Sequence, residues 1–172
     1  MKIDFLIDQR ELGRFDASCE AMITNVGRGT KAATIEAISA IIDDSLQQVP
    51  VETGTLAKSI YGGTYRRTDI KGYTYGGIVG FGVPDSSDNI DWIKEPNDGL
   101  NPRSGVRASV YATRVHEDLD ASHPNGGKAK FLEDPVRDYA ANNFARTAVN
   151  YWKRAINSSS VSVSTSEIQG RK

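Results

Sequence analysis

The chain has 172 residues, of which 38% are hydrophobic and 25% are charged, and its formal net charge at pH 7 is −1. This length suits one domain, and the small charge gives no global electrostatic reason to expect binding to nucleic acid or to a membrane surface. The single cysteine, Cys19, excludes an internal disulfide framework and is typical of a protein folded in a reducing cytoplasm. No stretch approaches the ~20 apolar residues that span a bilayer, and the first residues lack the apolar core of a signal peptide.

The first 30 residues predict a short strand and then a helical segment. Within residues 2–8, apolar residues alternate with polar ones, which favours a strand. Residues 10–26 have helical character, but Gly13 and the two glycines of residues 27–30 ("GRGT") are expected to weaken or interrupt the helix.

The clearest helix is predicted over residues 31–48, where apolar residues recur at steps of three and four. Pro50 disfavours helical geometry at the residue before it, so we expect the helix to end there. The residues expected on its core side are Ile35, Ile38, Ile41, Ile42, Leu46 and Val49.

Three strands are predicted after this helix. Residues 59–68 and 73–83 both have strand character, and the intervening "DIKG" is a plausible hairpin turn. In residues 107–117, successive side chains also fall into two alternating sets, as on the two faces of a strand, so these residues are the third predicted strand.

The acidic segment 84–105 is too long for an ordinary loop in a compact domain, and such loops are usually functional or disordered. Its middle carries an apolar trio, Ile90, Trp92 and Ile93, for which a purely solvated loop has little use. We expect the trio to form an interface that orders against a neighbouring subunit.

A final helix is predicted over about residues 135–157, with Asp134 as N-cap and Pro135 as first helical residue. A Ser-rich tail, 158–172, is expected to be flexible, and its Val161 and Val163 could add as a strand to a neighbour. The predicted fold class is therefore α+β: a single domain, 1–157, with a mainly antiparallel sheet of three to five strands flanked by the 31–48 and 135–157 helices.

The two histidines suggest one possible chemistry. His116 and His123 enclose Glu117 and further acids, and imidazole with carboxylate is the donor set of zinc or non-haem iron sites. A metal-dependent hydrolase using His116, Glu117 and His123 is therefore one alternative. The spacing matches no standard helix-borne metal motif, and a strand end running into a polar turn accounts for the same residues.

Other constellations are weaker. Arg66 and Arg67, among the tyrosines of the predicted hairpin, could form a stacking surface for single-stranded nucleic acid, although cross-strand aromatic pairs also explain the tyrosines. Cys19 is expected to be a small buried hydrophobe, and the glycine clusters lack the lysine of a phosphate-binding loop. We therefore expect a protein that is not an enzyme and has no catalytic, cofactor-binding or metal site.

The stretch "VPVETGTLAKSI", residues 49–60, predicts a fixed corner between helix and sheet. Pro50 stops the helix, and Gly54 permits a turn geometry that other residues resist. Val51 and Leu56 are expected to pin the flanks to the core, and Thr53 to bond its own backbone or cap the next segment.

Three sequence blocks in this order resemble a family of tailed-phage proteins known as neck, tail-completion or minor capsid components. The first block is the prolyl corner, the second a Tyr-Ala-x-x-Val/His-Glu strand, and the third a Phe-Leu-x-x-Pro start of the final helix. In this chain the matching residues are Pro50, Val51, Glu52, Thr53, Gly54, Leu56, Ser59, Ile60, Tyr111, Ala112, Val115, His116, Glu117, Phe131, Leu132 and Pro135.

The resemblance covers roughly residues 30–150 and implies a structural virion protein at the head–tail junction, made in the host cytoplasm. It implies copies of the chain in a homo-oligomeric ring, as a hexamer or dodecamer, that joins the connector to the tail. The implied partners are connector or stopper proteins on one side and tail-tube or terminator proteins on the other, with passing contact to DNA in the channel.

Overall fold

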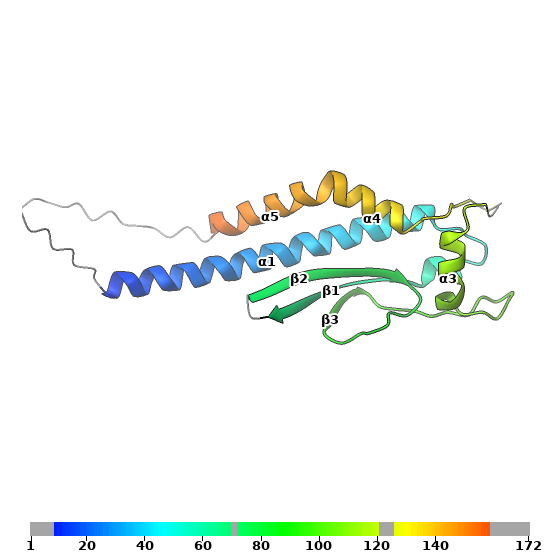
Figure 1. Ribbon diagram of the computed structural model, residues 1–172, viewed down its shortest axis with the longest axis horizontal. Helices are drawn as coiled ribbons and strands as arrows, with labels where there is room; N and C mark the ends of the chain where they lie inside the picture. Colours follow the sequence, from blue (N-terminus) through cyan, green and yellow to red (C-terminus); the bar gives the residue numbers. More distant parts are fainter. Residues whose placement is uncertain (1–8, 70–71, 121–125, 159–172) are drawn as a thin grey trace, which may run out of the picture.

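The computed structural model describes residues 9–69, 72–120 and 126–158, and its fold class is α+β, as predicted (Figure 1). The long helix α1 lies between two layers, with the sheet on one side and the C-terminal helices on the other (Figure 1). The predicted strand at residues 2–8 lies outside the described residues. In chain order the elements are α1 (Gln9–Gln48), α2 (Thr55–Lys58), β1 (Ile60–Asp69), β2 (Gly72–Phe81), β3 (Ile90–Lys94), α3 (Ala108–Glu117), α4 (Glu133–Tyr139), the π-helical turn η1 (Ala140–Phe144) and α5 (Ala145–Ser158).

Helix α1 is one continuous helix of 40 residues, so the predicted interruption at Gly13 and at residues 27–30 is wrong. A glycine costs a helix only about 1 kcal/mol, which tertiary contacts readily offset. Gly29 also serves the contact with α5, because a Cβ there would lie 3.2 Å from the carbonyl oxygen of Tyr151 and 3.3 Å from the Cβ of Ala155. The glycine therefore allows the two helices to approach closely.

The predicted core side of α1 is largely confirmed. Ile38, Ile42 and Val49 are buried, whereas Ile35 is exposed and Ala33 and Ala37 are buried. Because α1 has the sheet on one side and α5 on the other, small residues are buried between its neighbours and Ile35 lies at an open edge.

The predicted hairpin is confirmed in antiparallel register, from Ile60 opposite Phe81 to Asp69 opposite Gly72; residues 70–71 of its turn lie outside the described part. The third strand differs from the prediction. It is β3, inside the predicted loop 84–105, and it pairs antiparallel with the free edge of β1, giving the order β2-β1-β3. Trp92 of β3 packs edge-to-face on Tyr61, with 5.8 Å between ring centroids.

Residues 107–117 form helix α3, so their prediction as a strand is wrong. The segment is short, and the spacing of Ala108 with Ala112 and of Tyr111 with Val115 fits a helix at least as well as an alternating strand. Tertiary contacts decide between the two, because Ala108 and Ala112 are buried and the first turn receives a capping carboxylate from another segment.

Glycines in the sheet allow its backbone to lie close to α1. A Cβ on Gly62 would lie 2.7 Å from side-chain atoms of both Ile38 and Ile42. On the opposite face, the ring of Tyr61 covers Gly80 and the ring of Tyr65 covers Gly76 across the β1–β2 pair. Tyr61 and Tyr65 thus each pack on a glycine of the neighbouring strand.

The predicted 135–157 helix is present from Glu133 to Ser158, with a π-helical turn at Ala140–Phe144. Asp134 is not its N-cap; Leu132 holds that position without a side-chain cap, because the backbone is already helical at Leu132. Asp134 instead contacts Lys128 at 2.7 Å and Arg137 at 2.6 Å, and Pro135 is buried in the first turn. Within the described residues, no helix has the length and apolarity needed to span a bilayer.

Candidate functional site

The prolyl corner connects the end of α1 to the first strand through α2. The Val49 N–H still donates to the Ser45 carbonyl at 2.8 Å, and α1 ends before Pro50, as predicted. Gly54 has φ of 73°, the left-handed geometry that glycine adopts without strain, which confirms the predicted turn. The short helix α2 then leads through Ser59, whose hydroxyl donates to the Leu56 carbonyl at 2.7 Å, directly into β1.

Two expectations for the corner are wrong. Val51 is 45% exposed, because the bend at Pro50 directs it away from the core. Thr53 does not cap α2, whose N-cap is Gly54 without a side-chain hydrogen bond. The Thr53 hydroxyl instead shares a 3.0 Å hydrogen bond with the hydroxyl of Thr55. Leu56 is buried, as expected, and so is Ile60.

The three sequence blocks meet in one hydrophobic cluster. Val49 and Leu56 from the corner, Ala112 from α3 and Phe131 from the start of the final helix are all buried in it. Phe131 is at its centre, with its ring edge-to-face on Phe81, 5.0 Å between centroids. Tyr111, Val115 and Leu132 pack on the same cluster. Residues far apart in the sequence are therefore parts of one structural unit.

A chain segment, residues 126–131, crosses over the corner and closes it. The Lys128 N–H donates to the Gln48 carbonyl at 2.9 Å, which satisfies a carbonyl at the end of α1. The Lys130 N–H donates to the His116 carbonyl at 2.8 Å, near the end of α3. Gly127 lies so close to the backbone of Pro50 that any Cβ there would clash. We call residues 126–131 the crossing segment.

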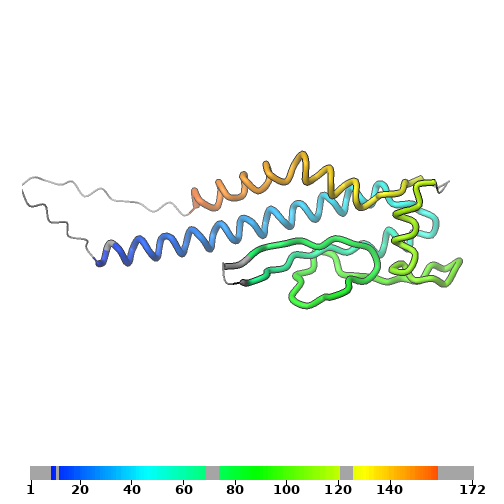
Figure 2. The backbone as a smooth tube through the Cα atoms, viewed as in Figure 1, coloured from blue at the N-terminus to red at the C-terminus, as the bar shows by residue number. Residues whose placement is uncertain are grey.

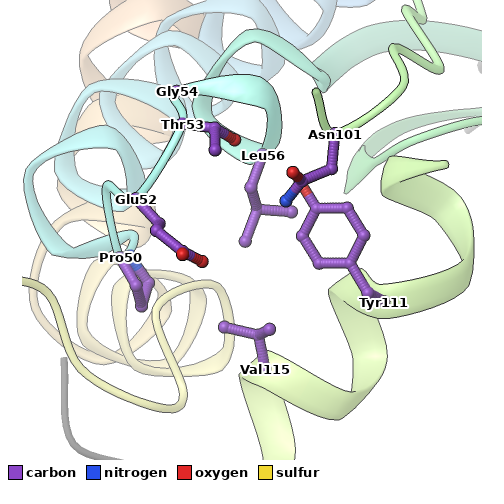
Figure 3. Close-up of a pocket in the computed structure, with 8 residues that line it drawn as sticks. All are labelled: Pro50, Glu52, Thr53, Gly54, Leu56, Asn101, Tyr111 and Val115. Carbon is purple, nitrogen blue, oxygen red and sulfur yellow. The ribbon is translucent and has the colours of Figure 1, made fainter. Parts of the chain in front are cut away.

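A cavity of about 190 Å³ opens between the corner and α3 (Figure 3). Leu56 and Val115 supply apolar walls, and Figure 3 shows Tyr111 and Val115 projecting from α3 toward the corner. Glu52 at its edge forms an exposed ion pair with Arg103 at 2.7 Å. Burial raises the pKa of the Tyr111 hydroxyl, with a smaller contribution from nearby Glu52. The volume is below the roughly 300 Å³ at which small-molecule pockets begin, so it suits one protruding side chain better than a free ligand.

The cavity wall on the far side comes from the segment before α3, which sequence reasoning treated only as loop. Asn101 is buried, and its N–H donates to the Val106 carbonyl at 2.9 Å while its carbonyl accepts from the Gly105 N–H at 2.8 Å. These bonds close a compact turn that continues into α3. An asparagine in a Gly- and Pro-rich stretch is a common turn signal, which could have pointed to it.

Asp98 caps α3 from ten residues upstream of its first residue, Ala108. Its carboxylate accepts hydrogen bonds from the Ser109 N–H at 2.8 Å and from the Ser109 hydroxyl at 2.9 Å. The Ser109 N–H above all, with the Ser109 hydroxyl and nearby Arg107 adding smaller contributions, lowers the pKa of Asp98 against the opposing effect of burial.

His116 and Glu117, proposed metal ligands in one alternative, hold α3 to the start of α4. The Glu133 N–H donates to His116 Nε2 at 3.3 Å, so His116 Nδ1 carries the proton shared with Glu117 at 2.7 Å. Lys130 binds Glu117 as well as Glu133, and its hydrogen bond is the main reason that the pKa of Glu117 is lowered. His123 lies outside the described residues, among which no group of three or more His, Cys, Asp or Glu side chains could hold a metal.

The remaining candidates that the structure describes do not line the cavity. Ile90 and Trp92 are half-buried on the protein's own sheet and Ile93 is exposed, whereas Val161 and Val163 lie outside the described residues. Arg66 and Arg67 are exposed on β1 and are not among the residues that line the cavity. Sequence reasoning missed a row of exposed apolar residues on the first half of α1, although their spacing of three and four is visible in the sequence.

No family model, curated protein or solved structure matches this chain.

Proposed function

We propose that the chain is a structural protein of a tailed-phage virion, located at the head–tail junction, where copies of it form a ring that joins connector to tail. What supports this most is the meeting of the three family-like blocks, the prolyl corner, residues 111–117 and residues 131–135, in one buried cluster.

The corner gives such a subunit its fixed shape. Gly54, α2 and the crossing segment hold the end of α1 against the first strand, so the angle between helix and sheet is set by buried contacts and hydrogen bonds. In a closed ring, a fixed angle inside each subunit sets the wedge between neighbours and thus the number of copies, which we expect to be six or twelve. The role is assembly, without catalysis.

The faces turned to other proteins would be those with exposed apolar side chains. In this proposal the edge strand β3, with Ile93 exposed, and the C-terminal tail with Val161 and Val163 contact ring neighbours or the connector, stopper, tube and terminator proteins. The small cavity between Leu56 and Tyr111 would receive one side chain from such a partner.

Deletion of the gene in the phage or prophage that encodes the chain tests the proposal. We expect filled heads and complete tails that fail to join, with joining restored by the wild-type gene. A Leu56→Asp variant, which places a charge in the corner cluster, should not restore it, whereas Val51→Asp at an exposed corner position should. Normal particles from the deletion strain, or purified virions without the chain, would refute the proposed role.

A further inference from the structure

The first part of α1 projects beyond the sheet and beyond the described end of α5 (Figures 1 and 2). It carries large apolar side chains that remain open to solvent: Leu12 is 51% exposed, Phe15 65%, Met22 43% and Ile23 57%. A solvated helix has no use for four such residues on a projecting end, since each loses the free energy that burial would supply.

The spacing of these residues is that of a helix-pairing seam. Leu12, Phe15, Cys19, Met22 and Val26 follow one another at alternating steps of three and four. This repeat places one residue per step on the same side of a helix and is the pattern by which α-helices pair knobs-into-holes.

The seam continues into the contact between α1 and α5. The Trp152 indole N–H donates to the Thr30 hydroxyl at 3.0 Å, and Thr30 lies two helical turns after Ile23 on the same side of α1. Trp152 and Ile156, one turn apart on α5, are themselves 39% and 47% exposed. We call Leu12, Phe15, Met22, Ile23, Trp152 and Ile156 the helical stripe; it extends over both helices of the pair.

We propose that two copies of the chain associate through the helical stripe. Helices α1 and α5 of one copy pack on α1 and α5 of the other, which gives an arrangement of four helices. The inference goes beyond the proposed function, on which its biological setting rests, because a two-fold contact joins two copies and differs from the head-to-tail contacts that close a ring. Two helices with a shared apolar side are half of such an arrangement, and a second copy supplies the identical half by a two-fold axis.

The size of the stripe fits one self-complementary interface. From the exposed fractions and about 150–250 Å² for a large side chain, the stripe leaves on the order of 600 Å² of apolar surface open. A standard interface buries roughly 800 Å² on each partner, of which somewhat more than half is apolar. The open apolar area of the stripe is therefore within the range of one such interface.

Charge also favours a second copy over a charged partner. Residues 10–28 hold three arginines and three acids, so two such segments can pair without net repulsion. A nucleic acid or a strongly acidic protein would be matched instead by a surplus of basic residues.

Sedimentation of the full chain over a range of concentrations tests the proposal. We expect a wild-type dimer whose dissociation constant rises at least about 100-fold in the double variant Phe15→Glu/Ile23→Glu. Both residues lie on the projecting part of α1, so thermal unfolding should show that the variant is folded. The control is Val110→Glu/Leu119→Glu, which changes two apolar residues in and just after α3 that are at least as exposed as Phe15 and Ile23, and it should leave the dimer intact.

Cys19 gives an independent measurement, because it lies in the middle of the seam and is the only cysteine. Mild oxidation should link wild-type copies into a disulfide-bonded dimer, and this product should be lost in Phe15→Glu/Ile23→Glu and in Cys19→Ser. A disulfide-linked dimer that forms equally well in Phe15→Glu/Ile23→Glu would overturn the proposed surface.

Three other results would overturn the inference. They are a wild-type monomer at about 100 μM, a dimer unaffected by the two glutamates, or a monomer that dimerises only when residues 159–172 are deleted, which would assign the stripe to the chain's own tail. None of these results bears on the proposed head–tail role, which is tested by gene deletion and by the composition of purified virions. A dimer of a protein that virions lack would sink the proposed role and leave the inference standing.

Discussion

The Asp98 carboxylate and the Ser109 backbone N–H lie 2.8 Å apart, joining an acidic segment before the cavity to the first turn of α3. This N–H is one of the donors that have no partner inside the helix. The Asp98 carboxylate accepts its hydrogen bond, as the side chain of a local N-cap residue usually does. Asp98→Ala should lower the free energy of unfolding by about 1 kcal/mol at pH 7. Urea unfolding measures this, with Asp88→Ala, an exposed acid of the same acidic segment, as the control expected to change little.

The effect of Asp98 should depend on pH in a defined direction. Its pKa is lowered in the folded protein, so the ionised carboxylate stabilises the fold at all pH values above the unfolded pKa of about 3.9. This contribution is lost as the pH falls through the folded pKa. The stability difference between wild type and Asp98→Ala should therefore be the same at pH 7 and pH 5.5 and should shrink below pH ~4. A difference that persists undiminished at the acid end would show that the carboxylate charge is not its cause.

Two glycines with open space around them should respond to the same substitution with opposite sign. Gly54 has φ of 73° and Gly13 lies in helix α1, and a Cβ on either would meet no atom within 4 Å. Gly54→Ala should destabilise by about 1–2 kcal/mol because alanine resists the left-handed geometry. Gly13→Ala should stabilise by up to about 1 kcal/mol because alanine favours the helix. Thermal unfolding of both variants, compared with wild type, decides the signs.

A larger side chain at Gly29 should separate α1 from α5. The Tyr151 carbonyl oxygen is only 3.2 Å from a Cβ at this position, and the contact is with backbone, which cannot rotate away. Gly29→Leu should therefore lower stability by about 1–3 kcal/mol and increase amide hydrogen exchange in α5. Gly13→Leu on the projecting part of the same helix is the matched control, and equal exchange in α5 for the two variants would contradict the expectation.

Phe131 should carry more stability than any other single side chain of the corner cluster. Its side chain is 1% exposed, and its ring packs edge-to-face on the rings of Phe81 and His116, with 5.0 Å between ring centroids in both pairs. Phe131→Ala should cost about 3–5 kcal/mol through the cavity it leaves, and Phe131→Leu appreciably less. Denaturant unfolding measures both. If Phe131→Ala cost no more than a surface substitution, the three blocks would not form one cooperative unit.

The parts of the fold that sequence predicts well are those set by local chemistry. Pro50 ends α1 and Gly54 makes the turn because each acts through its own backbone, and the β1–β2 hairpin follows from two strand-like runs close in sequence. The position of the corner is predictable for the same reason, whereas the exposure of Val51 and the hydrogen bond of Thr53 are not.

The parts that sequence misassigns are set by contacts between distant segments. α3 is a helix where alternation indicated a strand, because Asp98 caps it and Ala112 is buried against the corner. α1 continues through Gly29 because α5 lies against it, and through Gly13 because a single glycine costs a helix only about 1 kcal/mol. The cavity could not be predicted, since its two sides, near Leu56 and Tyr111, are brought together only by the folded chain.

The crossing segment also fixes when the corner can form as the protein is made. Its bonds to the Gln48 and His116 carbonyls, together with Phe131, complete a site whose first half leaves the ribosome much earlier. Until residue 131 has emerged, the Gln48 carbonyl at the end of α1 lacks its hydrogen-bond donor, and Val49 and Leu56 are not covered by Phe131. The nascent chain therefore carries this open end while the residues between the corner and the crossing segment are made, and a chain stalled in that interval would expose apolar surface of the kind that chaperones bind.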